Sequence, residues 1–194
     1  MLVLIVGPSG AGKDTLLNGA RQALAGDHRI RFVRRTITRP AHPNRGEEKH
    51  DTLTEQAFEA IRTAGGFALS WRAHGLHYGV PSDIGIDLAE GRVVVVNVSR
   101  AMVVEAADRF PVRVIEIAAP ADLLARRLAA RGREDAVDVA RRLSRQIELP
   151  MPVERVSVVN DSTVEAGVRK LVAALNRAVA DAPQSGSAGP APAG

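Results

Sequence analysis

A glycine-rich loop near the start of the chain carries the residues whose types and spacing point most directly to chemistry. The run Gly7-Pro8-Ser9-Gly10-Ala11-Gly12-Lys13-Asp14 has glycines where the backbone must curl and a lysine directly after the last of them. Successive N–H groups of such a loop point at phosphate oxygens, and the lysine reaches the outer phosphates. We therefore expect an ATP-binding loop, with Lys13 catalytic, made of Gly7, Pro8, Ser9, Gly10, Ala11, Gly12, Lys13, Asp14 and Thr15.

Asp14 departs from the usual form of this motif. Most such loops place serine or threonine after the lysine, where the hydroxyl binds Mg²⁺; here the order is Asp14 and then Thr15. A carboxylate beside a polyphosphate is repelled unless a cation lies between them, and Mg²⁺ prefers oxygen ligands of this kind. Asp14 is thus a candidate Mg²⁺ ligand, directly or through water. The alternative, that it only caps the following helix, stays open.

The elements around the loop are those the motif requires. Leu2 to Val6 is an apolar strand before it, and an apolar stripe at helical spacing follows it. Residues 36–51 are polar and rich in turn formers, which predicts an irregular loop. Other strands are predicted at 30–33, 67–73 (with alternate residues buried), 76–80, 92–98, 112–117 and 156–159, with helices between several of them. This alternation predicts an α/β fold with a parallel, doubly wound sheet.

Two helix starts are predicted from capping boxes. Thr52-Leu53-Thr54-Glu55 is expected to open a helix that stops at Gly65, and Ser162-Thr163-Val164-Glu165 is expected to open the last helix. The buried face of that last helix is predicted to be Val164, Val168, Leu171, Val172 and Leu175.

Length and composition favour one globular domain. We expect residues 1–182 of the 194 to fold as that domain and residues 183–194, PQSGSAGPAPAG, to be a disordered tail. The absence of cysteine suits a reducing cytoplasm, and the first apolar run is too short to span a membrane. The net charge is +4, but only 3% of residues are aromatic, which argues against nucleic-acid binding. A small-molecule partner is expected; the sequence does not reveal the oligomeric state.

The order of several motifs resembles the guanylate kinase superfamily over roughly residues 1–180. These motifs are the phosphate loop, Thr36-Ile37-Thr38-Arg39-Pro40, Arg45-Gly46-Glu47, and Trp71 followed by Gly75-x2-Tyr78-Gly79. Within it, the chain is most similar to the ribose 1,5-bisphosphate phosphokinases of bacterial phosphonate catabolism, which also carry aspartate after the loop lysine. The resemblance implies a P-loop NTPase fold with an acceptor-binding insertion at 36–81 and a lid at 131–149. It also implies γ-phosphoryl transfer from ATP to ribose 1,5-bisphosphate, giving phosphoribosyl diphosphate.

The resemblance also implies roles for individual side chains. Arg39 matches an acceptor-phosphate ligand and Tyr78 a residue that lines the acceptor pocket. Arg35 and Arg45 are further candidates on their own charge, because a bisphosphate acceptor needs several cations near the insertion. In the lid, Arg131 and Arg142 match arginines that close over the ATP phosphates and stabilise the transferring charge. The role of His50 stays open.

Two other functions are weighed against this one. Guanylate kinases carry acidic residues that bind the guanine edge; Ser70, Asn97 and Ser99 at the matching positions are uncharged, which counts against a nucleoside monophosphate kinase. Non-catalytic guanylate kinase-like modules typically lose the phosphate loop, which is present here. Because an acceptor phosphate is already ionised near neutral pH, no protein base is expected, and catalysis would rest on positioning and charge neutralisation.

Overall fold

The computed structural model of the chain describes residues 1–38, 51–129 and 153–182. Its larger sheet has five parallel strands in the order β2-β7-β1-β8-β9, which confirms the predicted parallel sheet. The strands are β1 (Leu2–Val6), β2 (Ile30–Phe32), β7 (Val93–Asn97), β8 (Val112–Ala118) and β9 (Arg155–Val159). Because the strands are parallel, the loops that follow β1, β7, β8 and β9 all lie at one edge of this sheet.

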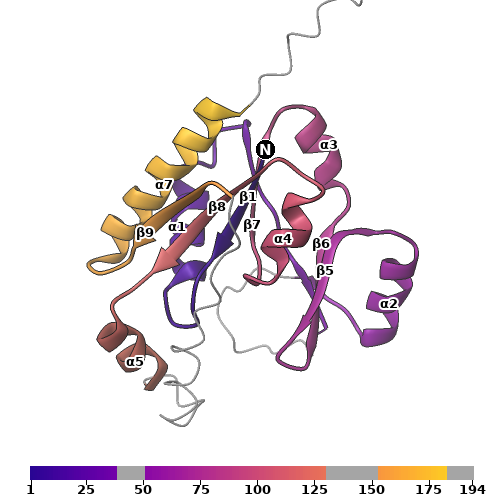
Figure 1. The fold of residues 1–194 in the computed structure, drawn as a ribbon, viewed down its shortest axis with the longest axis horizontal. Helices are drawn as coiled ribbons and strands as arrows, with labels where there is room; N and C mark the ends of the chain where they lie inside the picture. Colours follow the sequence, from indigo (N-terminus) through magenta and orange to yellow (C-terminus); the bar gives the residue numbers. More distant parts are fainter. Residues whose placement is uncertain (39–50, 130–152, 183–194) are drawn as a thin grey trace, which may run out of the picture.

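Helices cover both faces of the five-stranded sheet, as a doubly wound fold requires (Figure 1). The helices α1 (Lys13–Ala23) and α7 (Val164–Asp181) pack on one face with Val3 and Ile5 of β1. The opposite face, with Leu2, Leu4 and Val6, is covered by α3 (Ile84–Ala89) and α4 (Met102–Ala107). All five side chains of β1 are fully buried, so the strand before the phosphate loop lies at the centre of the core.

A second, smaller sheet lies beside the first and has the order β4-β3-β6-β5. Its strands are β3 (Thr36–Ile37), β4 (Asp51–Thr52), β5 (Phe67–Ala73) and β6 (Leu76–Pro81), and α2 (Glu55–Thr63) precedes β5. The prediction of an irregular loop over 36–51 is wrong at both ends, because Thr36 and Ile37 pair with β4 on one side and β6 on the other. Residues 39–50 lie outside the described part of the chain.

The caps of two helices lie two residues and one residue after the predicted positions, Thr52 and Ser162. The cap of α2 is Thr54 rather than Thr52, because Thr52 is paired in β4 and the Thr54 hydroxyl accepts from Ala57 N–H at 3.2 Å. The cap of α7 is Thr163, whose hydroxyl accepts from Ala166 N–H at 3.2 Å. Val164, predicted to be buried, is 47% exposed; it is the first residue of α7.

The alternation predicted along β5 is interrupted at its start. Ala68 and Leu69 are neighbours in the chain and both are buried. The register between β5 and β6 shifts between Phe67 and Leu69, which is the mark of a β-bulge. The extra residue breaks the period of two that the sequence pattern suggested.

Candidate active site

The phosphate loop leaves the buried end of β1 and enters α1, and two of its glycines are fixed by close neighbours. Gly7 has φ 148° and faces the Ile117 carbonyl oxygen so closely that a side chain there would overlap it. Gly12 has φ 87°, and a Cβ at that position would lie 2.5 Å from Asn160 Nδ2. The left-handed backbone and the lack of space both require glycine at Gly12.

Lys13 is the first residue of α1, and its ammonium group lies across the loop. Its Nζ donates to the carbonyl oxygens of Gly7 at 2.8 Å and Pro8 at 2.9 Å. This geometry holds a positive charge at the mouth of the loop, beside the amino terminus of a helix. Both are favourable for a polyphosphate anion.

Two side chains from distant parts of the chain also reach the loop. Asn160, which follows β9 and is 4% exposed, donates from Nδ2 to the Ala11 carbonyl at 2.8 Å. Arg127 of α5 (Ala121–Ala129) donates to the Gly10 carbonyl at 3.4 Å. Neither was predicted as a site residue. For Asn160, the available indication was a polar residue directly after an apolar strand. For Arg127, it was the spacing of four from Arg131, which places both on one side of a helix.

Asp14, in the first turn of α1, contacts the end of β7. Asn97 Nδ2 donates to Asp14 Oδ1 at 3.1 Å, over 83 residues of sequence. Nothing in the sequence pattern indicated this pair. The described residues contain no cluster of three or more His, Cys, Asp or Glu side chains suited to a metal.

A second group of predicted residues meets on the smaller sheet. The rings of Trp71 and Tyr78 stack at 5.3 Å with an interplanar angle of 8°, because the two residues are directly paired across β5 and β6. The Arg35 guanidinium lies over the Tyr78 ring at 5.6 Å. Two of the predicted acceptor residues, Arg35 and Tyr78, are thus in contact.

Apart from Arg35 and Tyr78, the residues considered for the acceptor site and the lid are not among the described ones. Arg39, Arg45 and His50 of the insertion and the lid residues Arg131 and Arg142 lie outside the described part of the chain. Their roles remain predictions.

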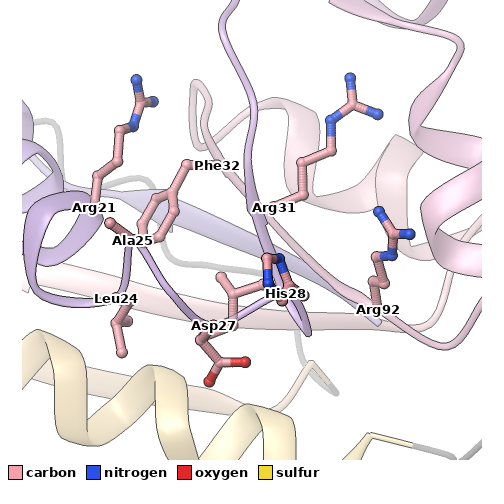
Figure 2. A pocket seen from close by; sticks show the side chains of 9 residues that line it. Arg21, Leu24, Ala25, Asp27, His28, Arg31, Phe32 and Arg92 are labelled. Atoms are coloured by element: carbon pink, nitrogen blue, oxygen red, sulfur yellow. The ribbon is translucent and has the colours of Figure 1, made fainter.

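A hollow of about 570 Å³ lies at the opposite edge of the larger sheet, near the amino ends of β2 and β7 (Figure 2). Two of its arginines form ion pairs within the protein: Arg31 with Asp83 at 2.8 Å and Arg92 with Asp87 at 3.0 Å. Arg21 lies over the Phe32 ring at 5.7 Å, and burial, with the nearby charge of Arg34, lowers the pKa of its guanidinium. The hollow is separate from the phosphate loop.

A doubly wound parallel sheet, a phosphate loop after its central strand and a small accessory sheet together define a P-loop protein with a guanylate kinase-like fold. A crystal structure of guanylate kinase from Anaplasma phagocytophilum aligns over 92% of this chain and 85% of its own length, with a TM-score of 0.66 and 17% identity. The ribose 1,5-bisphosphate phosphokinase PhnN of Methylobacterium radiotolerans is 49% identical over 90% of this chain and 96% of its own length. The chain belongs to the ribose 1,5-bisphosphate phosphokinase family.

Other relatives agree with this assignment. The Acidiphilium cryptum protein of the same name is 51% identical over 85% of this chain and 86% of its own length. A bifunctional ribose 1,5-bisphosphokinase–thymidine phosphorylase of Azorhizobium caulinodans is 48% identical over 90% of this chain, which spans 25% of that longer protein. No family model matches the sequence. Among the described helices, none is both long and apolar enough to cross a membrane.

Proposed function

We propose that this chain transfers the γ-phosphoryl group of ATP to ribose 1,5-bisphosphate, giving 5-phosphoribosyl 1-diphosphate and ADP, as a step of organic phosphonate catabolism. The observation that carries the proposal is the phosphate loop with the Lys13 ammonium at its mouth. It occurs in a chain whose sequence is 49–51% identical to those of two proteins named for this reaction. We assign the reaction to the cytoplasm, where ATP is available.

Gly7 to Thr15 would hold the triphosphate of ATP, with Lys13 moving from the loop carbonyls to the outer phosphates. The Asp14 carboxylate fits Mg²⁺, since it is a hard oxygen donor at the loop and is paired with a neutral amide rather than a protein cation. Bound Mg²⁺ would neutralise phosphate charge during transfer. Asp14 would supply one of its ligands, directly or through water.

The smaller sheet would bind the acceptor. Arg35, held over Tyr78, presents a cation beside an aromatic surface, which suits a phosphorylated sugar with charged groups and an apolar C–H face. Arg39 and Arg45, from the insertion over 36–81, would supply further charge. Arg131 and Arg142, from the lid over 131–149, would close over the transferring group. On this proposal residues 1–182 act as one kinase domain, with residues 183–194 as a tail.

Transfer needs no general base, because the 1-phosphate oxygen of the acceptor attacks as an anion. That oxygen forms a bond to the γ-phosphorus while the bond to the β–γ bridging oxygen of ATP breaks, and ADP leaves with the negative charge. The protein would align the two substrates and offset this charge.

Phosphorus NMR of the protein with ATP and Mg²⁺ tests the proposal, with ribose 1,5-bisphosphate, ribose 5-phosphate and GMP in parallel tubes. We expect new diphosphate resonances only with the bisphosphate. Turnover of GMP would instead indicate a nucleoside monophosphate kinase, and no turnover with any acceptor would indicate a binding module. Arg39→Ala should raise the KM for the bisphosphate more than the KM for ATP, since Arg39 is assigned to the acceptor.

A further inference from the structure

Asn97 occupies the point where the larger sheet meets the start of α1. It is the last residue of β7 and lies beside Ile5 of β1 in the register. Along β7, Val93 and Val95 pack under α1 and α7, whereas Val94 and Val96 face the other side. Asn97 continues the row of Val93 and Val95. Its side chain is therefore on the face of the sheet that α1 covers, at the edge where α1 begins.

The contact between Asn97 and Asp14 joins a neutral amide to a charged carboxylate. Asn97 Nδ2 donates to Asp14 Oδ1 at 3.1 Å, and no arginine, lysine or histidine among the described residues forms an ion pair with this carboxylate. An amide donor fixes one carboxylate oxygen without cancelling the negative charge. Asp14 is exposed, so its second oxygen, Oδ2, can still accept from a ligand.

We propose that Asn97 is a positioning residue that aims Asp14 at the divalent cation of the nucleotide; this rests on the metal role of Asp14 in the proposed function. An arginine or lysine at position 97 would neutralise Asp14, and an aspartate would repel it. An amide does neither, and it holds the carboxylate as a neighbour of a metal ligand should. On this proposal Asn97 does more than replace the acidic residue with which guanylate kinases bind guanine: it has a function in nucleotide binding.

Calorimetry of ADP binding with and without Mg²⁺ tests this inference directly. The ratio of the two affinities measures how much the cation strengthens binding, independently of turnover. Asn97→Ala should reduce this ratio about tenfold, the usual effect of removing a group that orients a metal ligand, and should leave the Mg²⁺-free affinity unchanged. Asp14→Asn should reduce the ratio at least as much. In the Asp14→Asn background, Asn97→Ala should have no further effect.

Asn176→Ala is the matched control, because Asn176 is an exposed asparagine on α7 and should leave the ratio unchanged. If thermal melts show that Asn97→Ala is unfolded, Asn97→Leu keeps the side-chain volume without the donor. A wild-type ratio in either variant overturns the inference, as does an equal loss with and without Asp14. A wild-type ratio in Asp14→Asn overturns both the inference and the metal role. If the wild-type protein binds no ADP at all, the proposed function itself fails.

Discussion

The side chain of Asn160 donates to the carbonyl oxygen of Ala11 at 2.8 Å, joining two residues that are 149 positions apart in the chain. Its backbone N–H donates in turn to the Ala118 carbonyl at 2.8 Å, at the end of β8. The turn between β9 and α7 is therefore tied both to the sheet and to the phosphate loop. Asn160 holds the loop in the shape in which Gly12 has no room for a side chain.

Replacing Asn160 with alanine should destabilise the protein and weaken nucleotide binding together. The Ala11 carbonyl loses its buried partner, which should lower the free energy of unfolding by about 1–3 kcal/mol. Urea unfolding measures the first effect and ADP calorimetry the second. Asn160→Asp should be worse, since it sets an acceptor against an acceptor. If both variants match Asn176→Ala in both measurements, Asn160 does not hold the loop.

Lys13→Ala should remove phosphoryl transfer with little loss of stability. In the fold the ammonium group donates to the Gly7 and Pro8 carbonyls, and it would contact the charge that develops during transfer. We expect kcat to fall by about 10²- to 10³-fold, the usual loss when one such stabilising donor is removed. A coupled assay for ADP gives the rate, and circular dichroism checks the fold. Arg177→Ala, which removes an exposed cation of α7, should behave as wild type.

Tyr78 should act through its ring rather than its hydroxyl. Tyr78→Phe keeps the stacking on Trp71 and the contact with Arg35, whereas Tyr78→Ala loses both. Since each contact contributes on the order of 0.5–1 kcal/mol, Tyr78→Ala should raise the KM for ribose 1,5-bisphosphate about tenfold. The KM for ATP should not change. Steady-state kinetics with each substrate varied decides this, and a phenylalanine variant as poor as alanine would assign the role to the hydroxyl.

Asp87 should matter for stability alone. Its side chain is 6% exposed and is an ion-pair partner of both Arg31 and Arg92, at the edge of the sheet away from the phosphate loop. Asp87→Ala should lower the free energy of unfolding by about 1–3 kcal/mol, because two cations lose a buried acceptor. Glu59→Ala breaks an exposed pair with Arg62 and should lower the free energy of unfolding much less than Asp87→Ala does. Unfolding curves compare the two variants. A fall in kcat for Asp87→Ala would contradict the prediction that Asp87 affects stability and not activity.

Much of the fold was predictable because its signals are local. The apolar run Leu2–Val6 and the glycines after it fix a buried strand and a phosphate loop without reference to the rest of the chain. The β-branched run of β7 and the helical stripe of α7 are similarly self-contained. The parallel sheet, the cover on both faces and the place of Lys13 and Asp14 at the start of α1 follow from these elements.

The predictions that were wrong or missing concern features that form only by contact with distant segments of the chain. The two-residue strands β3 and β4 have no period to detect and exist only because they pair. Thr52 fits the capping-box pattern, but it pairs in β4, and the helix begins after Thr54 instead. The contact of Asn97 with Asp14 spans 83 residues, so no spacing rule reveals it.

The burial of β1 between β7 and β8 has a consequence for how ligands are received. A loop rooted in a strand with neighbours on both sides, and with all five side chains enclosed, has little conformational freedom left to lose. Nucleotide docking there should carry only a small entropic penalty from ordering the chain.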